Sequence, residues 1–159
     1  MQTSIDDFFK PRKAVVDDSV YIIYFDGASR SNPGPASYGG VIYKSTDHGK
    51  EEIYNYREFI GKATNNEAEY RGLLNGLRLA KEKNLSNIKV FGDSKLIIEQ
   101  VCGNWKIKSP HLKPFHREIC QLKREFNSIS FQHVYRKDNK RADELANQAL
   151  DEEKDLKTV

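Results

Sequence analysis

Apolar runs in the first part of the chain predict strands that follow one another through tight turns. Residues 21–25 form a continuous apolar run, which is typical of a strand in the middle of a sheet. The sequence Asn-Pro-Gly-Pro at 32–35 is a strong turn signal, and it precedes a second strand expected over 38–44. A hairpin connection at 47–50 leads to a third expected strand over 53–60. These three strands predict an antiparallel meander.

Apolar positions change to a helical period after Thr64. Thr64 is followed three residues later by Glu67, which matches a capping box at the start of a helix. The apolar stripe of this helix consists of Tyr70, Leu73, Leu74 and Leu77. We therefore expect a long amphipathic helix that opens at Thr64.

The rest of the chain repeats strand and helix. A strand is expected over 88–91, a short helix over 94–101, a helix after Pro114, a strand over 128–135 and a last helix from near Asn139. The apolar positions of the last two helices are Phe115, Ile119, Leu122 and Phe126, then Ala142, Leu145, Ala146, Ala149 and Leu150. This order predicts an α/β fold with a five-stranded mixed sheet, in which three antiparallel strands precede parallel βα units and helices flank the sheet.

Length and composition indicate one folded domain with tails. The chain has 159 residues, of which 38% are hydrophobic and 31% charged. Residues 1–19 carry many charges with little periodicity and predict a flexible tail, residues 20–152 predict the domain, and residues 153–159 a C-terminal tail. No run approaches the roughly 20 apolar residues of a membrane span, and no signal-peptide pattern opens the chain, so no membrane partner is expected.

The net charge and the spacing of the cysteines and histidines limit which partners and metals the chain is expected to bind. The net charge of +3 permits a polyanionic partner without requiring one. Cys102 and Cys120 show no paired spacing, which favours reduced thiols over a disulfide. The four histidines also lack metal-ligand spacing, which argues against a zinc site.

Four short acidic motifs carry the most informative signal. They centre on Asp26, Glu69, Asp93 and Asp143. Asp26 and Asp93 directly follow expected buried strands, so they lie side by side if the first and fourth strands are neighbours. Converging carboxylates repel one another unless a cation lies between them, and oxygen ligands suit Mg²⁺ or Mn²⁺. The motifs predict a two-metal site for phosphodiester chemistry, although each acid taken singly could be only a helix cap or a solvated charge.

Residues 20–150 resemble a type 1 ribonuclease H, the endonuclease that cuts RNA in RNA–DNA hybrids. The matching strings are DGAS-RSNPGPASYGG, TNNEAEYRGLLNGL, GDSKLIIEQ and NKRADELANQAL, in the family's order. The resemblance implies a ribonuclease H-like fold, two Mg²⁺ ions per site with Mn²⁺ as a substitute, and products ending in 5′-phosphate and 3′-hydroxyl. It also implies that Asp26, Glu69, Asp93 and Asp143 are the catalytic and metal-binding residues. Glu67 shares the second string, but the family's glutamate falls at Glu69.

The resemblance further implies how a hybrid is held. The turn after the first strand and the asparagines before Glu69 would sense 2′-hydroxyls, Thr64 would hold a DNA-strand phosphate, and a tryptophan among lysines would contact the DNA strand. The expected substrate-binding residues are Gly27, Ser29, Asn32, Thr64, Asn65, Asn66, Lys95, Trp105, Lys106 and Lys108. The alternatives are that Trp105 has a core or partly buried packing role, that the asparagines only shape the helix start, and that the lysines form a solvated face.

Three departures from the family pattern change these expectations. Residues 108–110 lead straight into the next helix, so the long basic insertion that grips the hybrid in many members is missing. Residues 135–138 replace a glycine-rich loop with a histidine, and Arg136 is the candidate substitute, with an electrostatic role because arginine stays charged at neutral pH. Lys95 stands where a neutral glutamine is common, which argues against direct reading of a base or sugar at this position. The pattern resembles short archaeal-type members, some of which also cut RNA duplexes.

The first residues carry a second resemblance, to the peptide that docks on the eukaryotic and archaeal sliding clamp, PCNA. Gln2, Ile5 and Phe8 are spaced by three, so one 3₁₀ turn aligns them. Ile5, Phe8 and Phe9 would enter an apolar pocket, and Gln2 would make a polar anchor. The alternative is that the phenylalanines pack on the domain itself.

These features together predict a clamp-tethered ribonuclease H that acts as a monomer. Two alternatives stay open: a nuclease of the same fold that acts on double-stranded RNA or on DNA, and a non-catalytic nucleic-acid-binding module beside the clamp. An archaeal source would place the protein in the cytoplasm, and a eukaryotic source would place it in the nucleus.

Overall fold

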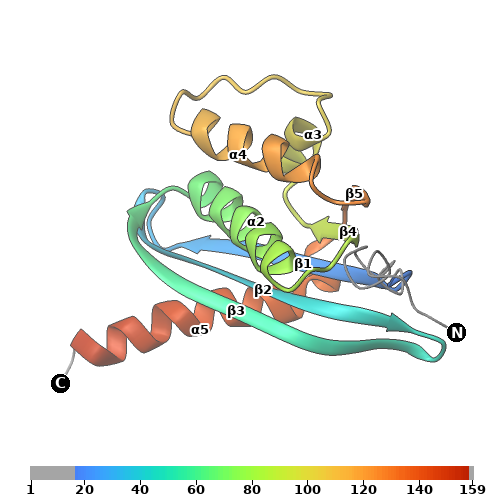
Figure 1. The fold of residues 1–159 in the computed structure, drawn as a ribbon. Coiled ribbons are helices and arrows are strands. Elements are labelled where there is room, and N and C mark those ends of the chain that lie inside the picture. Colours follow the sequence, from blue (N-terminus) through green and yellow to red (C-terminus); the bar gives the residue numbers. More distant parts are fainter. Residues whose placement is uncertain (1–16, 158–159) are drawn as a thin grey trace, which may run out of the picture.

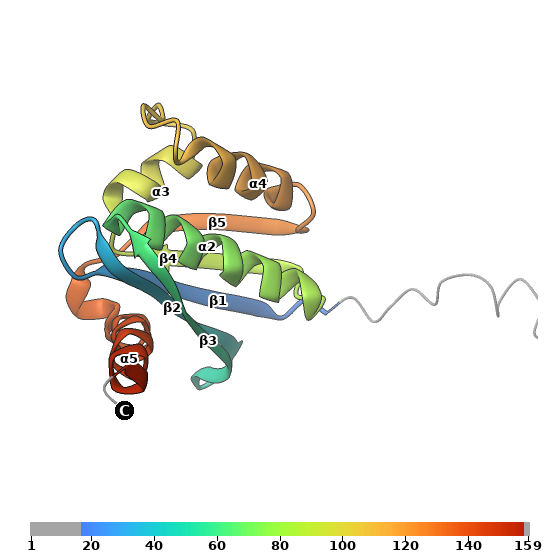
Figure 2. The ribbon, with the colours of Figure 1, turned by 90° about the vertical axis from the view of Figure 1, so that its left-hand side faces the viewer.

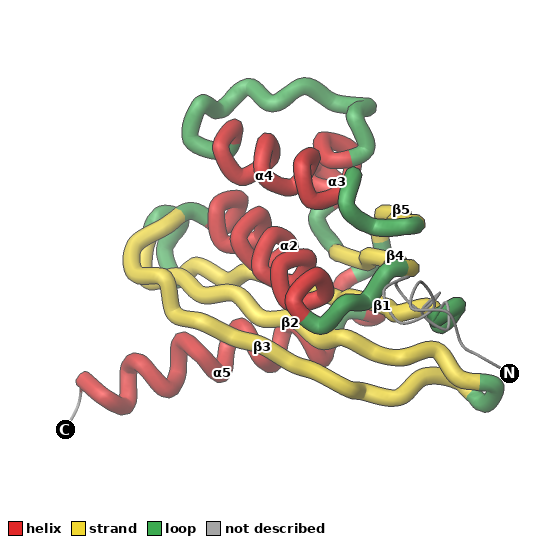
Figure 3. The backbone as a smooth tube through the Cα atoms, in the orientation of Figure 1, coloured by secondary structure: helices red, strands yellow, loops and turns green. Residues whose placement is uncertain are grey.

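A computed structural model describes residues 17–157, which form one sheet with helices on both faces (Figures 1 and 3). The elements are β1 Val20–Ser29, β2 Gly34–Thr46, β3 Gly49–Ala63, α2 Asn65–Glu82, β4 Asn87–Gly92, α3 Lys95–Val101, α4 Lys113–Lys123, β5 Ser128–His133, the 3₁₀ helix η1 Arg136–Asp138, and α5 Lys140–Lys157. Every strand and helix expected from the periodicity is present, and the predicted fold class is confirmed.

The sheet is mixed, with the strand order β3-β2-β1-β4-β5. β1 and β2 pair antiparallel, as do β2 and β3, whereas β4 runs parallel to both β1 and β5. The first and fourth strands are therefore neighbours, as the acidic motifs required. In the parallel pair Phe25 lies opposite Gly92, so the carboxyl ends of β1 and β4 meet at the same edge of the sheet.

Several strands and helices begin or end at other residues than the sequence predicts. The β2–β3 ladder runs from Gly34–Ala63 to Thr46–Gly49, because backbone pairing continues through polar residues that periodicity does not detect. β5 ends at His133 because the chain turns into η1, and Phe126 is buried although it lies beyond the end of α4. Helix α5 continues to Lys157, so residues 153–157 extend a helix where a tail was expected.

The helices divide unequally between the two faces of the sheet. Figure 2 shows α2, α3 and α4 on one side and α5 on the other. The main core lies under α2, where fully buried Leu73 and Leu77 join Ile23 and Phe25 of β1. Helix α5 packs on β1, β2 and β3. A Cβ atom on Gly39 of β2 would lie 2.5 Å from the backbone nitrogen of Ala146, so the absence of a side chain there lets α5 lie directly on the sheet.

Some predictions fall outside the described residues or concern small features. The expected clamp-binding residues, Gln2, Ile5, Phe8 and Phe9, all precede residue 17 and lie outside the described part of the chain. Cys102 and Cys120 are both free thiols, as predicted. Within residues 17–157, none of the helices is both long and apolar enough to cross a membrane.

Candidate functional site

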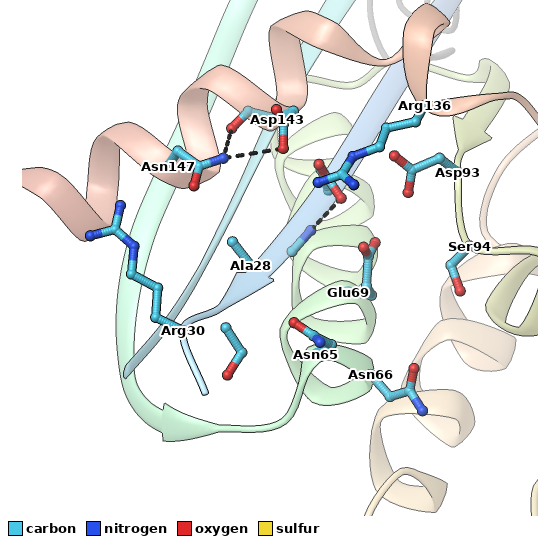
Figure 4. A pocket seen from close by; sticks show the side chains of 13 residues that line it. Ala28, Arg30, Asn65, Asn66, Glu69, Asp93, Ser94, Arg136, Asp143 and Asn147 are labelled. Atoms are coloured by element: carbon cyan, nitrogen blue, oxygen red, sulfur yellow. Dashed lines mark hydrogen bonds between the residues drawn. The ribbon is translucent and has the colours of Figure 1, made fainter. Parts of the chain in front are cut away.

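Three carboxylates from three separate elements meet at the carboxyl end of the two central strands (Figure 4). Asp26 belongs to β1, Asp93 follows the last residue of β4, and Glu69 lies in the first turns of α2. Each offers a carboxylate oxygen, and these oxygens lie within 4.8 Å of one another. We call this cluster the carboxylate site. Parallel pairing of β1 and β4 brings the two aspartates together, and the first turns of α2 place Glu69 beside them.

A glycine makes this meeting possible. A Cβ atom on Gly27 would lie 2.4 Å from the backbone nitrogen of Glu69 and 2.5 Å from the carbonyl carbon of Ala68. Only glycine therefore allows β1 to approach the first turns of α2 so closely. The Gly27 N–H also donates a hydrogen bond of 2.9 Å to the Asp26 carboxylate. Gly27 was expected at the substrate, and the structure shows that it also fixes the spacing between two of the acids.

The acids of the carboxylate site are buried close to one another, which is electrostatically unfavourable for their charged forms. Asp26 and Glu69 are 5% and 9% exposed. Burial, together with the charges of Asp93 and Asp143, raises the pKa of Asp26 to about 7. Burial also raises the pKa of Glu69 well above its usual value, with a second contribution from the charge of Asp26. Within residues 17–157 no lysine or arginine forms an ion pair with these acids.

The donor set fits a hard divalent cation. Oxygen Oε2 of Glu69 is buried and has no hydrogen-bond partner among the described residues. A buried carboxylate oxygen without a donor is costly, and a cation between the acids would satisfy it and offset their repulsion. All the ligand atoms are carboxylate oxygens, which suit Mg²⁺ or Mn²⁺ better than softer metals. The residues present therefore fit a metal of this class.

Asp143 and Arg136 border the same cavity from the C-terminal part of the chain. Both line it, but Asp143 lies outside the group of three acids whose oxygens converge. The side-chain amide of Asn147 donates to the Asp143 carboxylate at 3.1 Å and to its carbonyl oxygen at 2.9 Å (Figure 4). Asp143 is thus held at the edge of the cavity by its own helix, and the Arg136 side chain reaches the cavity from η1.

The start of α2 forms one wall of the cavity. The Thr64 hydroxyl accepts from the Glu67 N–H at 3.1 Å, which confirms the predicted cap. The Glu67 carboxylate does not complete the box by returning to Thr64; its Oε2 lies 3.5 Å from Arg71. Asn65 and Asn66, whose positions were predicted to face the substrate, both line the cavity.

The turn after β1 is fastened to the start of α2. The Asn32 side chain accepts a hydrogen bond of 2.9 Å from the Asn65 N–H, and the Ser29 hydroxyl donates one of 2.8 Å to the Ala63 carbonyl. Ser29 lines the cavity, whereas Asn32 acts as a cap on the helix start and does not line it. These two bonds hold the turn and the helix start as one unit.

A second cavity continues from Asn66 along α3 and the loop after it. It has a volume of about 630 Å³, and its lining includes Trp105, Lys106 and Lys108. Trp105 is 44% exposed, so it does not lie in the core, although part of its side chain is covered. The Lys95 ammonium lies 5.9 Å from the centre of the Trp105 ring. An aromatic ring among lysines beside the carboxylate site is a surface suited to a nucleic-acid strand.

Four cavity residues were not predicted from the sequence. Ala28, Arg30, Ser94 and Asn147 also line the carboxylate cavity. Asn147 follows Asp143 by one helical turn, so an i,i+4 search around each acid would have found it. Arg30 forms an ion pair of 2.5 Å with Asp151 of α5, and no local pattern signals a contact between residues so far apart in the chain.

Comparisons with known proteins show which proteins this chain is similar to. A family model described as "Reverse transcriptase-like" matches residues 24–149. The "Bifunctional protein Rv2228c" of Mycobacterium tuberculosis is 43% identical over 130 residues, which cover 82% of this chain and 35% of that protein. The "Ribonuclease HI" of Halobacterium salinarum is 43% identical over 129 residues, covering 81% and 63%. The chain therefore spans about a third of the mycobacterial relative and less than two thirds of the halobacterial one.

Solved structures of similar proteins superpose on this chain. RNase H1 from Halobacterium salinarum superposes with a TM-score of 0.78 at 40% identity, covering 84% of this chain and 98% of that one. LC11-RNase H1, solved in complex with an RNA/DNA hybrid, superposes with a TM-score of 0.76 at 38% identity, covering 83% and 97%.

Proposed function

The chain belongs to the reverse-transcriptase-like family, as a type 1 ribonuclease H-like domain, and from this premise we propose that it hydrolyses the RNA strand of RNA–DNA hybrids. The observation that carries the proposal is the meeting of Asp26, Glu69 and Asp93 within 4.8 Å, with a Glu69 oxygen that has no hydrogen-bond partner among residues 17–157. Ribonucleases H are metal-dependent, and the similar LC11 enzyme was solved with a hybrid bound.

The carboxylates would hold two Mg²⁺ ions, with Mn²⁺ as a substitute. Bound there, the ions would activate the attacking water and stabilise the charge on the leaving 3′-oxygen, giving 5′-phosphate and 3′-hydroxyl ends. Asp26 is suited to the central position because it lies on β1, the middle strand of the sheet. Asp143, oriented by Asn147, would complete the ligand set from the edge of the cavity.

The chain's other cavity residues would position the hybrid. Asn65 and Asn66 offer amides at the start of α2, where they could contact 2′-hydroxyls in a wide, shallow minor groove. The Arg136 guanidinium stays charged and would stabilise the scissile phosphate without moving a proton. Trp105 and the neighbouring lysines would carry the DNA strand, the ring against a sugar and the ammonium groups on phosphates.

The experiment that tests this function is cleavage of a labelled RNA–DNA hybrid with Mg²⁺, with Mn²⁺ and with chelator. Double-stranded RNA and double-stranded DNA of the same sequence run in parallel. We expect metal-dependent cutting of the RNA strand of the hybrid, and its loss in Asp93→Asn. Equal cutting of the RNA duplex would favour the broader nuclease. Binding without cutting under either metal would contradict the proposal and favour a non-catalytic module.

Recruitment by a PCNA-type sliding clamp is a further part of the proposal. It rests on the sequence alone, since the motif Gln2, Ile5, Phe8 and Phe9 precedes the described residues. A clamp tether would raise the local concentration of the enzyme at replicated DNA. Calorimetry with purified clamp should show binding that Phe8→Ala abolishes and Thr3→Ala leaves intact. Equal affinity of both variants would exclude this motif.

A further inference from the structure

A separate cavity lies where α5 begins, around an aromatic pair of the sheet. Its volume is about 160 Å³, and it is lined by Tyr24, Tyr43, Lys50 and residues 137–142. The rings of Tyr24 and Tyr43 meet edge to face with centres 5.8 Å apart. The Lys50 ammonium lies 4.7 Å and 4.6 Å from the two ring centres. We call this the tyrosine–lysine cavity, and none of its lining residues has a part in the proposed cleavage.

The tyrosine–lysine cavity carries an excess of positive charge. Among residues 17–157, Lys50, Lys137 and Lys140 have no carboxylate partner in an ion pair. The charge of Arg141 is already engaged by Glu52 at 2.9 Å. Asp138 is the acidic residue that lines the cavity, so three unpaired ammonium groups face one carboxylate. The first turn of α5 adds the positive end of a helix dipole.

A buried acceptor at the same place lacks a donor. Asn139 is 1% exposed and lines the cavity. Its amide nitrogen donates to the Phe25 carbonyl at 2.9 Å, but its Oδ1 has no hydrogen-bond partner among the described residues. A ligand for this cavity should therefore bring a donor group as well as negative charge. Nucleotides bring both, because they carry phosphates together with base amino or sugar hydroxyl groups.

The tyrosine–lysine cavity adjoins the carboxylate cavity through one short segment. Arg136, the first residue of η1, lines the carboxylate cavity, while Lys137 and Asp138 of the same turn line the tyrosine–lysine cavity. A strand that leaves the carboxylate site past Arg136 therefore needs to cross only η1 to reach the tyrosines.

We propose that the tyrosine–lysine cavity binds a single-stranded extension of the nucleic-acid substrate. One unpaired base would stack on the face of one tyrosine ring and meet the other ring at its edge, taking the place that the Lys50 ammonium occupies. The neighbouring phosphates would lie on the lysines. The extension is single-stranded because a duplex hides the faces of its bases, and stacking on aromatic rings is how unpaired strands are held. The inference rests on the proposed function, since it assumes that the hybrid occupies the carboxylate site.

The test compares blunt hybrids with hybrids that carry a single-stranded extension of about ten nucleotides at either end. Affinity is measured by fluorescence anisotropy on the full chain carrying Asp93→Asn, so that nothing is cut. We expect an extension at one end to tighten binding roughly tenfold, as stacking of a single base would provide. The triple change Lys50→Ala, Lys137→Ala and Lys140→Ala should remove this gain and leave the affinity for blunt hybrid unchanged.

The matched control is Lys83→Ala. The Lys83 ammonium lies 5.2 Å from the centre of the Tyr54 ring, so it makes the same kind of contact without lining this cavity. It should keep the full gain from the extension. No gain at either end, or a gain that survives the triple change, would overturn the proposal. So would an equal loss for blunt and extended hybrids, which would show only general attraction to phosphate.

Cleavage of the blunt hybrid by the chain without Asp93→Asn separates this inference from the proposed function. Cutting of the blunt hybrid with no gain from an extension would reject the tyrosine–lysine cavity alone. Absence of cutting would reject the proposed function whatever the extension does.

Discussion

The acids at the carboxylate site and the acids beside α5 are arranged in opposite ways. Three arginine pairs join α5 to the sheet and the turn after β1, namely Arg30–Asp151, Arg57–Glu152 and Arg141–Glu52, at 2.5, 2.8 and 2.9 Å. We call these acids the paired face. At the carboxylate site the acids are more deeply buried, and they have no basic partner among the described residues.

The difference is not a shortage of basic residues. The chain has 26 lysines and arginines against 23 aspartates and glutamates. The acids of the paired face lie near solvent, where pairing contributes little, and they are paired. The acids of the carboxylate site lie deeper, where an unpaired charge is most costly, and they have no basic partner among the described residues. This arrangement costs stability unless a cation comes from outside the chain, so the carboxylate site is built for a ligand and the paired face for docking a helix.

The largest effect that separates the two regions should come from Glu69→Gln. This change keeps the size of the side chain but removes a charge that would bind metal. Cleavage of the hybrid should fall about a thousandfold, which corresponds to roughly 4 kcal/mol of transition-state stabilisation. The measurement is the single-turnover rate at saturating Mg²⁺.

Glu67→Gln is the matched control for that change. Glu67 lies two residues earlier on the same helix, and its carboxylate faces Arg71 instead of the other acids. Its cleavage rate should stay within about threefold of the unmodified chain, because this partly exposed ion pair lies outside the carboxylate site. Similar losses for both glutamates would show that charge on α2 matters in general and that the carboxylate site is not special.

The second largest effect should be on the pH dependence of the free energy of unfolding, which the carboxylate site dominates. The pKa of Asp26 is raised to about 7 in the folded chain, against about 3.8 in the unfolded chain. Between these values the unfolded chain has released a proton that the folded chain retains, so the free energy of unfolding falls as pH rises from about 4 to 7 and then levels off. The loss is on the order of 4 kcal/mol in chelator, and Mg²⁺ should restore it at pH 7.5.

Urea unfolding of the metal-free chain against Asp26→Asn measures this contribution. The asparagine can still accept from the Gly27 N–H but cannot ionise. The variant should be more stable than the parent at pH 7.5 and equal to it near pH 4. A parallel pH profile for the two chains would rule out a strained Asp26 carboxylate. Asp17, whose pKa is lowered to about 2 by hydrogen bonds from Ser19 and Tyr21, titrates below this window.

Gly27→Ala should lower both the free energy of unfolding and the cleavage rate, and both effects should be smaller than those expected for the changes to the acids themselves. The added methyl group would lie within 2.5 Å of two backbone atoms of α2, so β1 and the helix start must separate. We expect a loss of about 1–3 kcal/mol in the free energy of unfolding, together with a lower cleavage rate, because Glu69 moves away from Asp26. Chemical unfolding and the single-turnover rate check the two parts. Unchanged rate and stability would show that the close approach is not required.

Local patterns were sufficient for most of the fold. The apolar run before Asp26 and the stripe after Thr64 depend on neighbouring residues, and both the strand and the helix are where they were expected. The three converging acids could also be identified from sequence, because parallel neighbouring strands end at the same edge of a sheet.

Contacts between distant residues could not be predicted in this way. Asn32 caps a helix that begins 33 residues later, and Asn139 holds the Phe25 carbonyl across 114 residues. The need for glycine at position 27 depends on how closely a strand and a helix pack, which no periodicity encodes. The outward position of Trp105 likewise follows from how the loop after α3 lies on the surface, and sequence reasoning left it open.

The smallest effect should come from the paired face. Arg57→Gln removes an ion pair with Glu152 whose side chains are 34% and 50% exposed. Solvent screens such a pair, so the free energy of unfolding should fall by less than about 1 kcal/mol, and 1 M salt should abolish the difference. The cleavage rate on blunt hybrid should not change, because the pair lies on β3 and α5 away from the cavity lining. Chemical unfolding at low and high salt measures the effect. A salt-independent loss of several kcal/mol would break the comparison, because the paired face would then carry as much electrostatic free energy as the carboxylate site.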